Sequence, residues 1–339
     1  MYTPKYELTP QLLSLITTIE RYYGQIEALK IPAKLELNLT RDNLVKSSYA
    51  SNRIEGNPLS EAEVTNLLLN DRVPTNRDEK EVINYFTILK HIHGYKDRPI
   101  TLSTVIDLHK QLMSGVDTIA GHIRDVAVVI GHYKDEKGDV SLRVKHNPPF
   151  HKKDQIEKAL QELLDWTQTA WELPAVIQTG LFHHQFVYLH PFEDGNGRVC
   201  RILIALLFLN RGYAINRYFV LDDYYDIDRD HYSDMLHSAD SGNLTRWLTY
   251  FAEGMKYSLQ SALSKYTDAM KTLRFEEQPS PKEREALRIL EEYKEITAPK
   301  VAELLHVSRQ QAHALLRALV DKGLVEKKGI TKRSYYMIK

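Results

Sequence analysis

Residues 190–201, HPFEDGNGRVCR, gather side chains that suit a reaction at a phosphate group. The imidazole of His190 can accept a proton near neutral pH, which is the task of a general base. The carboxylate of Asp194 is a hard oxygen ligand of the kind that Mg²⁺ prefers. We therefore expect a base and a metal ligand to flank one short loop.

A helix is expected to open near Gly195, Asn196 and Gly197 and to run through the apolar residues that follow. Glycine lets the backbone approach a ligand closely, and the free N–H groups at a helix start bind anions. Arg198 and Arg201 then share one helix face and can clamp phosphate oxygens. Together with the base and the metal ligand, these groups predict attack on a nucleotide phosphate.

This segment resembles the signature of the Fic family, H-x-F-x-D/E-G-N-G-R-x-x-R. All eight defined positions agree, namely His190, Phe192, Asp194, Gly195, Asn196, Gly197, Arg198 and Arg201. The resemblance implies an adenylyltransferase that moves AMP from ATP to a Ser, Thr or Tyr hydroxyl of a target protein, or of itself, and releases pyrophosphate. The unaltered Gly-Asn-Gly-Arg run favours this reaction over the phosphate transfer of a family branch whose loop is altered and bears a lysine.

The same resemblance implies a role for each group, with ATP as substrate and Mg²⁺ as cofactor. His190 is the implied general base, and Asp194 is the implied Mg²⁺ ligand. Residues 195–197 are the implied anion hole, and Arg198 and Arg201 are the implied partners of the β- and γ-phosphates.

Two further segments resemble parts of the same family. GHIR at 121–124, the hairpin after it and the residues at 147–149 resemble the family's flap. The nucleotide contacts implied for the flap are Val128, Val129, Ile130 and Gly131. DRDHY at 228–232 resembles the segment that lines the adenine pocket, so Tyr232 is expected to stack on adenine.

Upstream, SNRIEGN at 51–57 matches the family's inhibitory pattern through Ser51, Glu55 and Gly56. Ser51 and Glu55 share a helix face by their i, i+4 spacing, and Gly56 can end that helix. The helix dipole disfavours a carboxylate near a C-terminus, so Glu55 needs a cationic partner, and the resemblance supplies Arg201. Such a pair would withhold the arginine from the γ-phosphate and predicts autoinhibition, whereas a plain helix C-cap is the alternative interpretation.

Two other functions stay open at this stage. One is the reverse reaction, a deAMPylase that removes AMP from a modified protein, in which Glu55 would position a water molecule. The other is a DNA-binding regulator whose Fic core serves as a nucleotide sensor. The identity of the target protein cannot be read from the sequence.

The spacing of apolar residues and of helix caps predicts a mainly α protein with one β-hairpin in its middle part. The resemblance implies that these elements form a Fic-type helical core with a β-hairpin flap. We expect an N-terminal helical region over residues 1–95 that holds the inhibitory helix, from about Arg41 to Ile54. A Fic core over 96–275 and a winged helix-turn-helix domain over 280–339 follow. In the N-terminal region, a capping box at the start of one helix is predicted for Ser60 and Glu63.

The tail follows a polar stretch with two prolines at 276–283 and reads as three helices and a hairpin, an order that resembles a winged helix-turn-helix. Residues 280–339 hold 13 Lys and Arg against 8 Asp and Glu, a net charge of +5. The candidate DNA contacts open the last helix and fill the wing: Arg309, Gln310, Gln311, His313, Lys327, Lys328, Lys332 and Arg333. Binding of DNA, contact with a protein and formation of a homodimer all stay open.

Composition sets the remaining bounds. The 339 residues carry 45 Lys and Arg and 45 Asp and Glu, so no net field draws the chain to nucleic acid or membrane. The single cysteine, Cys200, excludes an internal disulfide and a cysteine-based zinc site. Without a signal-peptide pattern or a long apolar run, we expect a cytoplasmic protein with no membrane partner. His183 and His184 are expected to pack or hydrogen-bond in the core rather than bind a metal.

Overall fold

A computed structural model describes residues 2–70, 72–136, 139–272, 279–329 and 334–339. The chain divides into two compact units, Met1–Glu27 with Asp42–Leu263 and Ala28–Arg41 with Ser264–Lys339. Within the described ranges, no helix is both long enough and apolar enough to cross a membrane.

The N-terminal region is helical, as the apolar spacing predicted. Its helices are α1 (Pro10–Ala28), α2 (Ala33–Ile54), α3 (Glu61–Leu69) and α4 (Arg77–Lys90). Ser60 and Glu63 form a complete capping box at the start of α3, which confirms that prediction. Helix α2 begins earlier than predicted because no helix breaker follows Pro32, whose carbonyl accepts the first helical hydrogen bond from the amide of Glu36.

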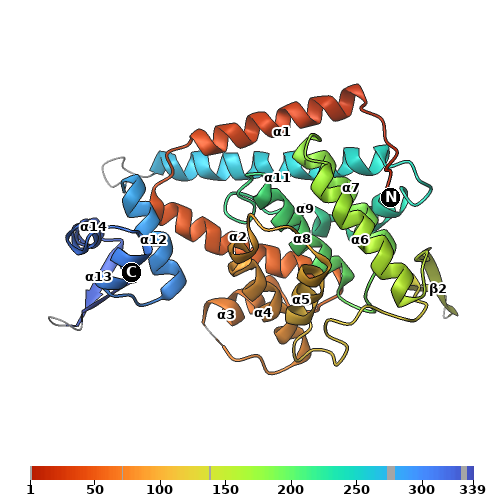
Figure 1. Ribbon diagram of the computed structural model, residues 1–339, viewed down its shortest axis with the longest axis horizontal. Helices are drawn as coiled ribbons and strands as arrows, with labels where there is room; N and C mark the ends of the chain where they lie inside the picture. Colours follow the sequence, from red (N-terminus) through yellow and green to blue (C-terminus); the bar gives the residue numbers. More distant parts are fainter. Residues whose placement is uncertain (1, 71, 137–138, 273–278, 330–333) are drawn as a thin grey trace. The chain divides into compact units, whose positions relative to one another are not determined.

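The centre of the first unit is a pair of buried helices, α7 (Ala175–Leu189) and α8 (Asn196–Asn210), which pack against each other (Figure 1). Both are buried on nearly every face, which explains why apolar residues surround each helix. The other helices of this part are α5 (Leu102–Leu112), α6 (Lys153–Thr169), α9 (Asp222–Ile227), α10 (Arg229–His237), α11 (Thr245–Thr272) and the 3₁₀ turn η1 (Ile92–Tyr95). The loop between α7 and α8 carries the motif, so the rigid core positions it.

The predicted hairpin forms between α5 and α6. Strands β1 (Ile130–Glu136) and β2 (Asp139–His146) pair antiparallel, with an irregularity in register between Ile130 and Gly131. The turn residues Lys137 and Gly138 lie outside the described residues.

The second unit contains the tail. Its elements are α12 (Pro281–Tyr293), α13 (Ala298–Leu304), α14 (Arg309–Asp321), β3 (Val325–Lys328) and β4 (Tyr335–Ile338), with β3 antiparallel to β4. This is the predicted order of elements, and the winged-helix identity stays a prediction. Ala33 from the start of α2 belongs to the same buried cluster as Leu287, Leu316 and Tyr336. The predicted wing residues Lys332 and Arg333, and linker residues 276–278, lie outside the described residues.

Candidate active site

His190 ends α7 in an unusual backbone conformation. Its φ of 48° lies in the left-handed region, which costs energy for a residue other than glycine and is found where the surrounding structure enforces it. The enforcing residue is Arg124, from the GHIR segment. Its Nε donates to the carbonyl of His190 at 2.6 Å and its Nη2 donates to the carbonyl of Leu189 at 3.2 Å.

The side chain of His190 is oriented for proton acceptance. Its Nδ1 lies 3.3 Å from the carbonyl oxygen of Val187, which can only accept, so Nδ1 carries the hydrogen. The lone pair is therefore on Nε2. Burial lowers the pKa of His190 to about 3, and the ring is neutral at physiological pH. A neutral ring with an available Nε2 is the form that a general base requires.

The loop after His190 is locked by Asn196. The Asn196 side-chain oxygen accepts from the amide of Phe192 at 2.9 Å, and its Nδ2 donates to the carbonyl of Phe192 at 2.8 Å. The ring of Phe192 is fully buried and stacks on His109, with centroids 3.7 Å apart. These contacts fix the loop on both its polar and its apolar side.

His109 was missed from the sequence, where it is one polar residue in an ordinary amphipathic helix. In the structure, its Nδ1 accepts from the amide of Gly121 at 2.8 Å, so its Nε2 donates to the carbonyl of Asp194 at 3.1 Å. Burial lowers the pKa of His109 to about 4, which keeps this single-donor form. His109 therefore holds the backbone of the predicted metal ligand.

The carboxylate of Asp194 is half-exposed and shared between two arginines. Oδ1 accepts from the amide of Gly195 at 2.5 Å and from Nη2 of Arg198 at 3.2 Å, and Oδ2 lies 3.1 Å from Nη2 of Arg77. Mg²⁺ usually takes one or two carboxylates together with substrate phosphates and waters. A single accessible carboxylate at the start of α8 fits that pattern.

Arg198 is almost completely buried, yet not every N–H group of its guanidinium has a hydrogen-bond partner within the described residues. Nη1 lies 3.1 Å from Oε2 of Glu81 and Nη2 lies 3.2 Å from Asp194, but Nε makes no hydrogen bond within the described part of the chain. A buried donor without a partner is costly, and a phosphate oxygen is the kind of acceptor that would satisfy it.

Arg201, by contrast, is fully engaged by the predicted inhibitory segment. Its Nε donates to Oγ of Ser51 at 2.7 Å, and its Nη2 donates to the carbonyl of Ser51 at 2.8 Å and to Oε1 of Glu55 at 2.7 Å. Asp222, which sequence reasoning missed, lies 3.6 Å from Nε. Burial favours the neutral form of Arg201, but the carboxylates of Glu55 and Asp222 outweigh it and raise the pKa.

Glu55 also lies directly over the start of α8. A Cβ atom placed on Gly197 would be 2.1 Å from Oε1 of Glu55, so only glycine allows this approach. Helix α2 ends at Ile54, and Glu55 and Gly56, the latter with a φ of 91°, form the turn that follows it. The glycine-rich opening of α8 is thus occupied by a carboxylate from the same chain.

Tyr232 is not placed as expected. It is buried, its ring stacks on Tyr225 with centroids 4.5 Å apart, and its hydroxyl bonds Nε2 of His183 at 2.9 Å. A ring in the aromatic core does not offer a face to adenine, so its position does not support the stacking role. The flap contacts expected at 128–131 lie on the approach to β1 and its first residues, and their role stays a prediction.

Comparison with known proteins finds relatives of this chain. Residues 99–208 match the family model described as the Fic/DOC family. A protein adenylyltransferase fic-1 from Caenorhabditis elegans is 25% identical over 236 residues, which are 66% of this chain and 41% of that protein. A protein adenylyltransferase Fic from Nematostella vectensis is 26% identical over 272 residues, 77% of this chain and 58% of that protein. The chain spans about half the length of the curated relatives it matches.

Solved structures agree on the fold. A Fic family protein from Desulfovibrio desulfuricans G20 superposes with a TM-score of 0.67 at 23% identity and covers 100% of this chain and 98% of that one. A Fic-1 structure from Caenorhabditis elegans gives a TM-score of 0.59 at 21% identity, over 77% of this chain and 73% of that one. The architecture is therefore the mainly helical Fic fold. Within it, residues 99–208 are the part that matches the Fic/DOC family model.

Proposed function

We propose that this protein is an autoinhibited adenylyltransferase, which transfers AMP from ATP to a Ser, Thr or Tyr hydroxyl of a target protein and of itself. The adenylyltransferases that resemble the chain support the reaction class. The contact between Glu55 and Arg201, with Oε1 and Nη2 2.7 Å apart, is the observation that carries the autoinhibition.

In the proposed reaction, Nε2 of His190 removes the proton of the target hydroxyl, and the hydroxyl oxygen attacks the α-phosphorus of ATP. The new P–O bond joins AMP to the target as the bond to the oxygen bridging the α- and β-phosphates breaks. Pyrophosphate leaves with that electron pair. The amide groups at 195–197 and the guanidinium groups of Arg198 and Arg201 hold the phosphates.

Asp194 is the residue that would hold Mg²⁺. Bound there, the ion would neutralise charge on the phosphates and help the leaving group. In the described state, Arg77 and Arg198 neutralise this carboxylate instead. Arg77 can release Asp194 at small cost, because its side chain is 58% exposed and the ion pair is therefore weak.

Autoinhibition follows from competition for Arg201. The Glu55 carboxylate takes the guanidinium that the γ-phosphate needs, and it occupies the space above Gly197. It also repels an incoming phosphate, because both are negative. ATP could then bind only in a pose that leaves the α-phosphate poorly aligned for attack.

The test is self-labelling with ATP labelled in its α-phosphate, for wild type and Glu55→Gly, each also carrying His190→Ala as a blank. The coupling energy of a close charge pair of this kind is a few kcal/mol. Since each 1.4 kcal/mol changes a rate by a factor of ten, we expect Glu55→Gly to label itself about tenfold faster than wild type, or more. Glu172→Gly, at an exposed loop carboxylate, is the matched control and should behave as wild type.

Equal or slower labelling by Glu55→Gly would contradict autoinhibition and leave the segment as an ordinary helix end. A target first labelled by Glu55→Gly and then mixed with wild type tests the reverse reaction. If wild type removes the label and His190→Ala does not, removal of AMP is the main activity, and Glu55 positions water for it. Mass spectrometry of lysate proteins after incubation identifies the modified hydroxyl.

A further inference from the structure

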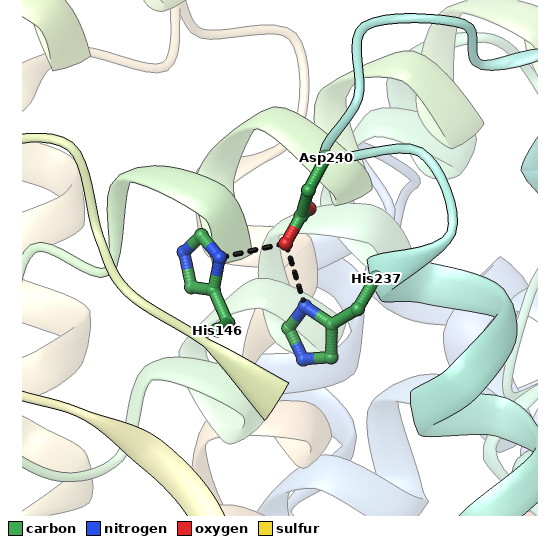
Figure 2. Close-up of side chains that lie close together, drawn as sticks. All are labelled: His146, His237 and Asp240. Carbon is green, nitrogen blue, oxygen red and sulfur yellow. Dashed lines mark hydrogen bonds and ion pairs between the residues drawn. The ribbon is translucent and has the colours of Figure 1, made fainter. Parts of the chain in front are cut away.

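Three histidines surround one carboxylate outside the proposed active site. His146 ends β2, His237 ends α10 and Asp240 follows in the next turn, while His184 comes from α7 (Figure 2). Nδ1 of His146 lies 2.7 Å from Oδ2 of Asp240, and Nδ1 of His237 lies 3.2 Å from the same oxygen. Nε2 of His184 lies 3.0 Å from Oδ1. His146 and His184 are buried, and His237 and Asp240 are partly buried.

The hydrogen-bond partners of His146 are unusual. Its Nε2 lies 2.9 Å from the carbonyl oxygen of Tyr188, which only accepts, so Nε2 carries a hydrogen. Its Nδ1 faces a carboxylate oxygen, which also only accepts. With Nε2 already donating, this buried contact needs either a proton shared between Nδ1 and the carboxylate or a cation placed between the two atoms.

We propose that His146, His237 and Asp240 bind a zinc ion through Nδ1, Nδ1 and Oδ2. These three ligand atoms lie within 4.8 Å of one another. Zinc–ligand distances near 2.0–2.1 Å place neighbouring ligands of a tetrahedral site about 3.3 Å apart. The His237–Asp240 distance already has this value, and the His146–Asp240 distance needs to open by about half an ångström. A water molecule would complete four ligands.

The surrounding groups match those that orient zinc ligands in proteins. Metal-bound histidines usually donate their other ring N–H to a carbonyl or carboxylate, and bound carboxylates accept hydrogen bonds of their own. Nε2 of His146 donates to the carbonyl of Tyr188, and Nε2 of His184 donates to Oδ1 of Asp240. Two imidazoles and one carboxylate favour zinc over Mg²⁺ or Ca²⁺, which prefer oxygen ligands only.

The ion would have a structural role beside the active site. It would join the end of flap strand β2 to α10, and its ligand His146 is bonded to the carbonyl of Tyr188, two residues before His190. Zinc would therefore fix the base of the flap relative to the end of α7. This inference does not depend on the proposed reaction.

The test uses untagged, chelator-treated full-length protein and titrates it with Co²⁺ and then Zn²⁺. We expect one ion per chain, visible d–d absorption from Co²⁺ that Zn²⁺ displaces, and a higher melting temperature with Zn²⁺ near pH 7.5 that is lost in acid as the ligands protonate. His237→Gln can still donate to Asp240 but is a poor zinc ligand. Loss of an outer partner alone costs about 10–100-fold, so this variant should bind Zn²⁺ more than about 100-fold more weakly.

His231→Gln, at an exposed histidine of the same helix α10, is the matched control and should bind as wild type. If wild type takes up no stoichiometric ion, or if His237→Gln and wild type respond equally to Zn²⁺, the proposal is overturned. The cluster is then held by hydrogen bonds alone, with a proton between His146 and Asp240.

Discussion

Helices α8 and α14 both carry arginines that were predicted to contact a ligand, nucleotide phosphates at α8 and DNA at α14, yet their first turns are built in opposite ways. Gly195 is the N-cap of α8, with a φ of 77° and no side-chain hydrogen bond to the helix. Ser308 caps α14 through a complete capping box, in which Oγ accepts from the amide of Gln311 and the Gln311 side chain accepts from the amide of Ser308. Helix α14 satisfies the amide of Gln311 with its own N-cap side chain, whereas α8 has no side-chain cap.

This difference between the two N-terminal caps indicates what each helix start can bind. At α8, the open amide end is covered by Glu55 from a distant segment, and Arg201 is buried against it. Under the proposed autoinhibition, removal of Glu55 would open this site. At α14, Ser308 already accepts from the amide of Gln311 and Arg309 is exposed, so we expect any contact with DNA to depend mainly on individual side chains. Changes at α8 should therefore have much larger effects than changes at α14.

The largest effect is expected at the base. His190→Ala should lower AMP transfer by about 10²–10⁴-fold while ATP binding stays nearly unchanged, because the imidazole acts on the hydroxyl and not on the phosphates. His190→Asn is a second variant, since asparagine tolerates the left-handed backbone found there. Initial rates are measured in the Glu55→Gly background. Transfer close to the parent rate in both variants would show that His190 is not the base.

The buried arginine of α8 comes next. Arg201→Ala leaves Glu55 and Asp222 beside an empty site, and loss of one partner from a buried ion pair costs about 3–5 kcal/mol of unfolding free energy. Arg309→Ala at the start of α14 should cost less than about 0.5 kcal/mol, as expected for an exposed side chain. Chemical denaturation of the two variants measures both values.

Adding Glu55→Gly to Arg201→Ala should restore part of the stability but no AMP transfer, because the γ-phosphate still lacks its partner. Full transfer by the double variant would contradict the phosphate-binding role.

Acid should destabilise the α8 site. Burial lowers the pKa of His109 to about 4 and of His190 to about 3, so both bind protons more readily in the unfolded chain. Their stabilisation is complete above the unfolded pKa of about 6.5 and is lost as pH falls toward the folded values, by up to about 1.4 kcal/mol per pH unit for each histidine. Denaturation from about pH 7.5 to about pH 5.5 measures this slope, which His190→Ala should reduce. An unchanged slope in that variant would remove His190 from the explanation.

The cap of α14 predicts a smaller effect. Ser308→Ala removes the hydroxyl that accepts from Gln311 and should cost about 1 kcal/mol. Ser308→Asn, a comparably good N-cap, is the control. A negligible loss in the alanine variant would mean that the first turn of α14 does not depend on its own cap.

The smallest effect concerns DNA. If the tail binds duplex, affinity should fall steeply with salt, and Arg309→Ala should lower the salt slope by about one phosphate contact. Point variants are preferable to deletion of residues 280–339, because Ala33 of α2 packs in the same core as the tail. Absence of any retained duplex in a low-salt gel shift would favour protein contact instead.

Features formed by residues close together in the sequence could be predicted, because their geometry depends only on the local backbone. His190, Asp194 and the two arginines fall within twelve residues, and spacing along a helix places Arg198 and Arg201 on one face whatever the rest of the fold does. The cap at Ser60 and the hairpin at 130–146 follow from equally local rules. The early start of α2 was missed because no strong capping residue marks it.

Apart from Glu55, which the family resemblance had paired with Arg201, the partners of those residues were not readable, since they come from remote helices. Arg124 lies 66 residues before His190, His109 lies 85 before Asp194, and Arg77 lies 117 before Asp194. Helix packing brings them together, and no spacing in the sequence encodes it.

The sequence by itself thus determined the chemistry available in the loop at 190–201, because the reacting groups are neighbours along the chain. Only the tertiary structure decided which charges face that loop and whether its donors are free. It added Asp222 to the expected pair of Arg201 and Glu55, left Nε of Arg198 without a partner in the described chain and buried Tyr232. The physical reason is that burial and ion pairing depend on distances between segments, which packing of the whole core sets.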